Sequence, residues 1–521
     1  MVRLAPQPQI RLRGLPLCTI HFLRPNSYIS AAPQNIRLLL ALACALHFVL
    51  GANLGLSVDE AHYALYAAHP DWSYFDHPPL VGWAQWPLVK LDAPEWLLRL
   101  VPELLWLGTA VLIYQLAERL ATVGNGEAGF WAVLTLALAP LLHVLGIGLL
   151  PDTLLMFLTV LVIVLTLNLM DADTVQQPWP WLALGLALGL AGLSKYTAIL
   201  AVPGVAVCLL AAYGWRVLGN RWLWAALVVA LLLVVPVAYW NYANHWISFS
   251  YQAKHGAGGG WQAVHVLRFL VVQLLVFGPL PLWGLTGLRQ GATGGKRAML
   301  LFFAVPFAVL AVLSGGGTSL PHWTAPAWVA LAPFAGIGLA RTWSLGRRWV
   351  IALIAVAQGL LCAAALGLMI TGGYPLMTNA SGQGNSTAPS NPFADLHGWD
   401  VAGARARVLA AQQGLKSVSV QNWTLASRLG WYARPLPVQV LEDRFDQFDL
   451  WAGDLPVGGD TLLVDWSQLG YTVPLGEHGF ADCKLLDSQD VQRLGRVISS
   501  FRFYACHGWS GRPQPRLAGA S

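Results

Sequence analysis

The 521-residue chain is 56% hydrophobic and only 11% charged, with a formal net charge of +6. Soluble domains average about 25% charged residues, so this composition excludes an ordinary soluble globular protein. The basic residues lie in short loops and form no basic stripe interleaved with aromatic side chains, so we assign no nucleic-acid partner.

The chain begins with a basic segment, residues 1–35, which we expect to be a disordered extension or an over-long gene start. The apolar run that follows, Ile36 to Ala52, is open to two interpretations: the core of a signal peptide or a first membrane helix. We favour a retained helix, because a polar motif follows it immediately and no clear cleavage site precedes it.

Eleven apolar segments predict eleven membrane spans, since roughly 20 apolar residues cross a bilayer. The predicted spans cover residues 36–53, 97–118, 128–146, 152–170, 180–194, 197–213, 222–242, 264–286, 298–314, 324–340 and 348–371. The fold class is therefore a polytopic α-helical membrane protein, with a transmembrane domain over residues 36–371.

Lys and Arg in the short loops predict the orientation of the chain. With the N-terminus in the cytoplasm, the cytoplasmic loops carry most of the basic side chains: Arg119, Arg216, Arg221, Arg289, Lys296, Arg297, Arg341, Arg347 and Arg348. This bias agrees with an odd number of spans. It places the first loop and the C-terminal tail outside, in a periplasm or its equivalent.

The first outer loop, residues 57–83, reads "SVDEAHYALYAAHPDWSYFDHPPLVGW" and is unusually rich in acids and histidines. Asp59 and Glu60 directly follow the first span and can simply end a helix. Asp76 and His77 precede a pair of prolines, which stiffens the chain as a site of fixed geometry requires. Ionisable groups at membrane depth are a functional hypothesis by default.

The later outer loops add polar groups on the same side of the membrane. "PDTLL" gives Asp152, "LSKYTA" gives Lys195 and Tyr196, "WNYANHW" gives His245, and "SLPHWTAPAW" gives His322 and Trp323. Each has a structural explanation: an acid caps a helix, a lysine snorkels, and histidines beside tryptophan sit at the membrane interface. Their shared sidedness favours a functional site.

Cofactor motifs are scarce. Asp59, Glu60, His62 and His77 are acceptable metal ligands, but no HExxH or paired-cysteine spacing is present, so a divalent metal stays open. No P-loop occurs, and no GxGxxG opens a helix after a strand, so a nucleotide donor is not indicated.

Residues 372–521 return to a polar composition and predict an α/β domain outside the membrane. "LKSVSVQ" and "DTLLVDW" have strand character, "ADLHGWDVAGARARVLAAQQ" has helix character, and residues 378–392 are typical of a flexible linker. Cys483 and Cys506 lie in this oxidising compartment, so we expect a disulfide, with two buried free thiols as the alternative.

The blocks "DEAHYALYAAHPDWSYFDHPPLVGW", "PDTLL", "LSKYTA", "WNYANHWISFSYQ" and "PHWTAPAW" occur in this order, followed by "DRFDQFDLW". Together they resemble the bacterial members of glycosyltransferase family 39, the protein-mannosyltransferase-like branch of the GT-C membrane enzymes. The resemblance covers residues from about 50 to 470. It implies a bacterial inner-membrane enzyme that moves a sugar from a polyprenyl-phosphate carrier to a cell-envelope lipid, glycan or protein on the outer face.

The resemblance also implies roles for individual residues. The family's first-loop acid falls on Asp59, with Glu60 beside it, and its second acid falls on Asp152. Related lipid A aminoarabinose transferases carry an acid–lysine pair before the two prolines, where this chain has Asp76 and His77. The histidine leaves open which group neutralises the carrier phosphate: His77, Lys195, His245 or a metal held by Asp59 and Asp76. Asp76, Tyr196, His322 and Trp323 are the further expected substrate-binding residues.

The expected reaction is a direct displacement with inversion at the anomeric carbon and Asp59 as the base. Three rival functions remain: a transporter or flippase of a lipid or lipid-linked sugar, an O-antigen ligase or polymerase, and a membrane glycosidase with two carboxylates. A transporter is expected to carry charges deep within its spans. Here most charges lie at the outer ends of the spans.

Overall fold

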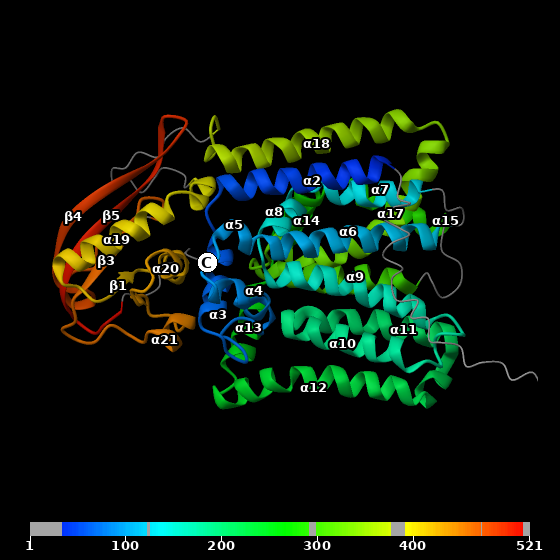
Figure 1. Ribbon diagram of the computed structural model, residues 1–521, viewed down its shortest axis with the longest axis horizontal. Helices are drawn as coiled ribbons and strands as arrows, with labels where there is room; N and C mark the ends of the chain where they lie inside the picture. Colours follow the sequence, from blue (N-terminus) through cyan, green and yellow to red (C-terminus); the bar gives the residue numbers. More distant parts are fainter. Residues whose placement is uncertain (1–33, 122–125, 291–297, 377–390, 470, 514–521) are drawn as a thin grey trace, which may run out of the picture.

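The computed structural model describes residues 34–121, 126–290, 298–376, 391–469 and 471–513. The predicted basic extension, apart from its last two residues, and most of the predicted linker lie outside the described residues. Figure 1 shows a bundle of long helices with a unit that contains a β-sheet at one end.

Eight helices of the described residues are long and apolar enough to cross a membrane. They are α2 (Gln34–Asn53), α5 with α6 (Glu95–Leu98 and Leu100–Leu120), α9 (Pro151–Leu169), η1 with α11 and η2 (Tyr196–Gly219), α12 (Arg221–Ala243), the helix over Ala298–Gly316 that contains α16 (Leu301–Leu313), η6 with α17 (Pro321–Ser344), and α18 (Arg348–Thr371).

The other three predicted spans are helical but irregular. Helices α7 (Glu127–Ala137) and α8 (Pro140–Ile147) bend by 78° at Pro140, and α14 (Ala263–Phe277) bends by 96° from the segment Leu280–Arg289 that holds α15. Helix α10 (Pro178–Ser194) has 17 residues, at the short end of the spanning range. The expected eleven spans therefore become eight, or ten if each bent pair crosses the membrane.

The bundle has an apolar exterior. Leu227, Leu231, Leu232 and Val235 of α12 each expose about half or more of their surface, whereas α9 and α17 are buried along most of their length. Such an outward apolar face is stable in lipid and not in water. The chain is a multi-pass membrane protein.

The first outer segment is not a loop, as the sequence predicted, but two short helices, α3 (Val58–Ala68) and α4 (Leu80–Lys90). Ser57 and Glu60 form a capping box at the start of α3, in which each side chain meets the other's backbone N–H. The acids therefore begin a helix rather than end one. All eight residues Glu60–Ala67 are buried, and six of them are alanine, tyrosine or leucine; the other two are Glu60 and His62.

The C-terminal unit is a five-stranded mixed sheet with the order β2-β1-β3-β5-β4. The strands are β1 (Val418–Val420), β2 (Val438–Val440), β3 (Thr461–Trp466), β4 (Phe480–Arg493) and β5 (Arg496–Trp509), with helices α19 (Trp399–Gln413), α20 (Trp423–Tyr432) and α21 (Gln447–Trp451). Both predicted strands and the predicted helix are present. Cys483 and Cys506, opposite each other on β4 and β5, form a disulfide.

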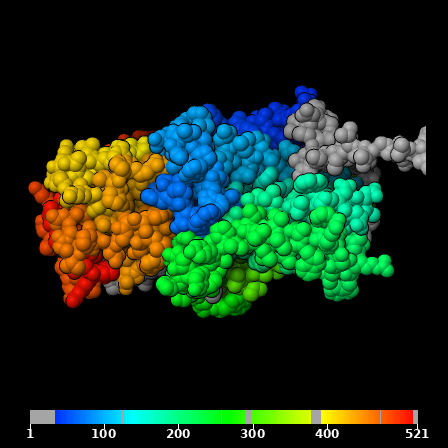
Figure 2. Space-filling model, turned by 60° about the horizontal axis from the view of Figure 1, so that its bottom comes forward, coloured from blue at the N-terminus to red at the C-terminus, as the bar shows by residue number. Residues whose placement is uncertain are grey.

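The C-terminal unit shares a hydrophobic core with the first outer segment. Ala61 and Leu65 of α3 pack with Leu425 and Leu429 of α20. Figure 2 shows the orange and red C-terminal unit against the blue first segment and the green helices α12 and α13 (Ile247–Ala257). This contact fixes α3, and the acids at its start, between the membrane bundle and the sheet.

Candidate active site

Asp59 lies in the first turn of α3, where the helix dipole and free N–H groups favour an acid. Its side chain is half-buried and makes no hydrogen bond or ion pair with the described residues. Burial, opposed by His62 and reinforced by the nearby carboxylates of Asp76 and Asp152, raises the pKa of Asp59 to about 6. Asp59 is therefore an accessible carboxylate and a stronger base than an ordinary aspartate.

Glu60, the other acid expected to be catalytic, has a structural placement instead. One oxygen accepts from Arg99 Nε at 3.0 Å, and the other caps α3 through the Ser57 N–H at 3.0 Å. Arg99 also donates to the backbone oxygens of Gly51, Leu54 and Gly55. Because both oxygens are engaged and buried, Glu60 fastens α3 to the start of α6 and is not free to act as a base.

Asp76 lies at the centre of a hydrogen-bonded group. Its carboxylate accepts from the Tyr66 hydroxyl, and its oxygen Oδ1 lies 3.7 Å from His62 Nε2. Burial raises the pKa of Asp76, but His62 and the Tyr66 hydrogen bond outweigh it and leave the pKa well below the ordinary range. Asp76 is thus an ionised carboxylate held in place, with His62 fixed in turn by Ser427 of α20 at 3.0 Å.

His77 follows Asp76 and contacts the ring of Tyr63. Burial lowers the pKa of His77 to about 4, with Asp76 opposing and Lys195 adding to the shift. The imidazole is therefore neutral at pH 7, and its Nδ1 is buried without a hydrogen-bond partner among the described residues. A neutral histidine can donate to a phosphate oxygen but supplies no charge to it.

Asp152 and Lys195 form a buried ion pair. Asp152 begins α9 after Pro151, and Lys195 ends the antiparallel helix α10; the lysine Nζ lies 2.8 and 2.7 Å from the two carboxylate oxygens. Both side chains are less than a tenth exposed. His322 Nε2 lies 3.7 Å from Asp152, and the ring of Trp323 lies 5.3 Å from the ammonium. This cluster joins three of the predicted outer loops.

Of two further predicted site residues, Tyr196 lies beside this cluster and His245 lies away from it. The Tyr196 hydroxyl lies 2.7 Å from Ser248 on α13, and Asn241 donates to it at 3.5 Å, so Tyr196 borders the cluster. His245 lies at the junction of α12 and α13 with a positive φ of 55° and an exposed side chain. The structure does not bring His245 to the other site residues, which weakens the expectation that it holds the phosphate.

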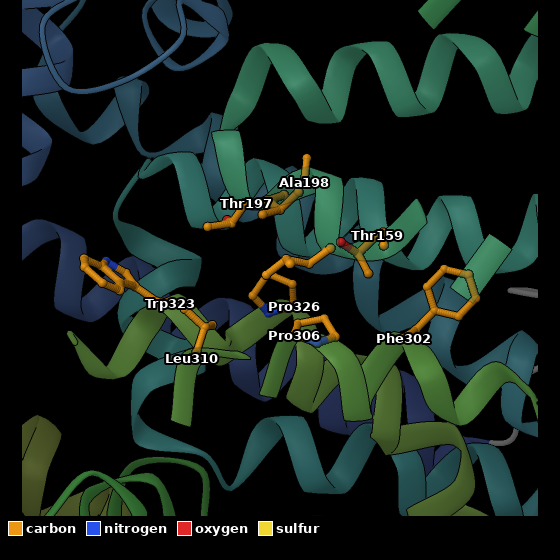
Figure 3. Close-up of a pocket in the computed structure, with 11 residues that line it drawn as sticks. Thr159, Thr197, Ala198, Phe302, Pro306, Leu310, Trp323 and Pro326 are labelled. Carbon is orange, nitrogen blue, oxygen red and sulfur yellow. The ribbon is translucent and has the colours of Figure 1, made fainter. Parts of the chain in front are cut away.

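A narrow apolar groove lies beside this cluster in the membrane bundle. Figure 3 shows its residues: Trp323 lies at one end and Phe302 at the other, with Thr159, Ala198, Pro306 and Pro326 between them. Trp323 also contacts Lys195, so the groove begins beside the buried cation. A long apolar chain with a phosphate at its end matches this combination.

The metal interpretation gains no support from the geometry. Within the described residues, no group of three or more His, Cys, Asp or Glu side chains is placed to hold a metal ion. Of the two expected ligands, Asp76 already accepts a hydrogen bond from Tyr66 and lies against His62, so it does not form a shared metal site with Asp59. We derive no step through a metal.

Sequence reasoning missed the residues that surround Asp76. Gln252 of α13 donates to the Asp76 backbone oxygen, and Gln447 of the C-terminal unit accepts from Phe75 N at 2.7 Å. Arg99 and Ser427 were also missed. Their partners lie 39 to 372 residues away in the chain, so no local pattern announces these contacts.

Comparisons with known proteins agree with this fold. Residues 76–240 match the family model described as dolichyl-phosphate-mannose-protein mannosyltransferase. The chain is 25% identical over 357 residues to the lipid A galacturonosyltransferase RgtD of Rhizobium johnstonii, covering 66% of this chain and 74% of the relative.

Two crystal structures of ArnT from Cupriavidus metallidurans share the fold. The structure bound to undecaprenyl phosphate superposes with a TM-score of 0.60 at 19% identity, and the apo structure with 0.59 at 20%; each covers 90% of this chain and 97% of the other. The protein is a membrane glycosyltransferase with the GT-C fold. Its resemblance to the protein-mannosyltransferase-like enzymes, predicted from the sequence, is confirmed.

Proposed function

We propose that this enzyme transfers a sugar from a polyprenyl-phosphate carrier to a cell-envelope acceptor, with a lipid A-type glycolipid as the foremost candidate. The observation that carries the proposal is the buried Asp152–Lys195 pair beside an apolar groove, near the half-buried carboxylate of Asp59. RgtD, by its name, acts on lipid A, and the ArnT crystal holds undecaprenyl phosphate.

The groove accounts for the donor's lipid. Its lining is almost wholly apolar, and it lies between α9, η1, α16 and α17 inside the membrane bundle. A polyprenyl chain in this groove places its terminal phosphate at Trp323 and Lys195. Lys195 is the cation that neutralises the departing phosphate, and Asp152 holds its side chain in place through the buried ion pair.

Asp59 supplies the base. As the acceptor oxygen attacks the anomeric carbon, its proton moves to the Asp59 carboxylate, and the bond between that carbon and the phosphate oxygen breaks. The bonding electrons leave with the carrier phosphate. Because the acceptor attacks from the opposite face, the configuration at the anomeric carbon inverts. With a pKa near 6, Asp59 is mostly ionised at pH 7 and takes a proton more readily than an ordinary aspartate.

We also propose the orientation and the domain roles. Residues 36–371 form the transmembrane domain, and residues 372–521 lie in the periplasm, with the N-terminus in the cytoplasm and the site on the outer face. Helices α11 (Val202–Tyr213) and α15 (Gly284–Gln290) reach the end of the bundle that lies away from the sheet (Figure 1). Arg216 follows α11, and Arg289 lies in α15. Basic residues at that end support a cytoplasmic placement.

The test uses purified protein in detergent with labelled polyprenyl-phosphate sugars and envelope acceptors, comparing the wild type with Asp59→Asn. The proposal expects transfer by the wild type and a loss of at least about 100-fold in the variant. Normal turnover by Asp59→Asn refutes the base. If the folded wild type consumes no carrier sugar, the transporter or flippase reading takes over, and flux in liposomes becomes the next measurement.

A further inference from the structure

Arg444 occupies an unusual position between the C-terminal unit and the first outer segment. It lies between β2 and α21, in the segment 441–446, and its side chain is half-buried. Its guanidinium stands 5.6 Å from the ring of Tyr251 on α13 and 5.8 Å from the ring of Trp423 on α20. Arg444 therefore bridges the membrane bundle and the C-terminal unit through two aromatic rings.

Arg444 forms no close ion pair with the described residues, although its charge interacts with that of Asp446. Its NH2 group donates to the Tyr251 hydroxyl at 3.1 Å, and no carboxylate of the described residues lies within 4.0 Å of the guanidinium. Asp446, two residues further along the chain, uses one oxygen to cap α21. A guanidinium has five donors, so most of those on Arg444 remain available to a ligand.

The segment that carries Arg444 is fixed to the site. Gln447 accepts a hydrogen bond from Phe75 N at 2.7 Å, and Phe75 precedes Asp76 in the chain. The rings of Phe445 and Tyr251 both pack on Phe75, at 5.7 and 4.5 Å. Only the ring of Phe75 separates the segment that carries Arg444 from Asp76, and these contacts fix the position of that segment.

Helix α13 connects Arg444 with the donor-phosphate cluster. Tyr251 stacks on His255 at 5.3 Å, and His255 contacts Trp323 at 5.6 Å, the same tryptophan that lies beside Lys195. The two cations, Lys195 and Arg444, therefore stand at opposite ends of this aromatic row. Lys195 is paired with Asp152 and lies beside Trp323, whereas Arg444 extends from the C-terminal unit to Tyr251 of α13.

We infer that Arg444 and Tyr251 form a second oxyanion subsite, which binds a carboxylate or phosphate group on the sugar or acceptor rather than the carrier phosphate. This inference rests on the proposed function and adds a specificity-determining residue to it. Guanidinium groups bind planar oxyanions with two parallel hydrogen bonds, and the rings of Tyr251 and Trp423 preset the plane of this one.

The experiment measures kcat and KM for four donor–acceptor pairs: polyprenyl-phosphate hexose or hexuronic acid, each with lipid A or dephosphorylated lipid A. Arg444→Gln is compared with the wild type and with Arg496→Gln, an arginine of the same unit that stacks on Tyr374. We expect Arg444→Gln to raise KM about tenfold or more for pairs with one particular anion, and to leave pairs without it unchanged. Arg496→Gln is expected to match the wild type throughout.

The outcomes distinguish an anion on the sugar from one on the acceptor, and a failure of the subsite from a failure of the proposed function. An effect that follows the hexuronic acid assigns the subsite to the sugar carboxylate, and one that follows the lipid A phosphates assigns it to the acceptor. An equal effect on all four pairs, or none, with a wild-type thermal unfolding temperature, overturns the subsite but not the transferase. No transfer by the wild type from any carrier sugar overturns the proposed function and this inference together.

Discussion

The pKa of Asp59 predicts an acid limb in the pH–rate profile that an ordinary aspartate does not give. The ordinary value is 3.8, and burial with nearby carboxylates raises it to about 6. A base with a pKa of 6 is about 90% ionised at pH 7 and about 10% ionised at pH 5, whereas one at 3.8 stays about 95% ionised at pH 5. Activity requires the ionised form, so the rate falls as pH decreases through about 6.

The assay follows sugar transfer at saturating donor from pH 4.5 to 8, with tryptophan fluorescence at each pH to confirm folding. We expect about a tenfold fall between pH 7 and pH 5. Asp446 needs a matched control, because burial raises its pKa to about 7, so it titrates in the same range. Asp446→Asn keeps a good N-cap for α21 and is expected to retain the limb near 6. A limb near 4 in the wild type, or one that disappears in Asp446→Asn, refutes the reasoning.

Five further variants test other parts of the site. Lys195→Met leaves Asp152 as an unpaired buried charge, which costs about 3–5 kcal/mol, so we expect a clear drop in the thermal unfolding temperature. The double variant with Asp152→Asn is expected to recover stability but not transfer activity. Glu60→Gln or Arg99→Met releases α3 from α6 and lowers the unfolding temperature, while the acid limb of the surviving activity stays near 6. Thr159→Trp fills the groove, so long-chain donors lose activity and a short-chain donor keeps it; equal losses for both contradict the lipid-binding role.

The sequence predicts the membrane helices well because hydrophobicity is a local property. All eleven apolar segments are helical, but the bends at Pro140 and before Leu280 decide which of them cross the membrane as single helices. The first outer segment is helical rather than the predicted loop, and Ser57 and Glu60 match the S-x-x-E capping box that marks a helix start. The long hairpin β4–β5 is not predicted, because β4 is polar over most of its length and lacks the regular alternation of apolar and polar residues that indicates a strand.

Side-chain partners were harder to predict than positions. Shared sidedness correctly placed Asp152, Lys195 and His322 together, because α9 and α10 are antiparallel neighbours whose ends meet at the outer surface. It could not reveal that Lys195 pairs with Asp152, or that His245 turns outward at a residue of positive φ. Glu60 and Asp59 are adjacent in sequence, yet Glu60 is bound by Arg99, whereas Asp59 has no hydrogen bond or ion pair with any described residue. Packing between distant segments decides this difference.

The shared core between α3 and α20 gives the C-terminal unit a direct influence on the catalytic base. Asp59 begins α3, the buried face of α3 packs on α20, and Ser427 of α20 holds His62, which faces Asp76. In the proposed reaction the donor lipid reaches the site from the membrane side through the groove. The proposed Arg444 subsite lies on the C-terminal side, in the unit that packs on α3. A lipid-bound donor and a water-exposed acceptor group can meet at the interface between the membrane bundle and the C-terminal unit. Asp59, in the first turn of α3, lies at this interface.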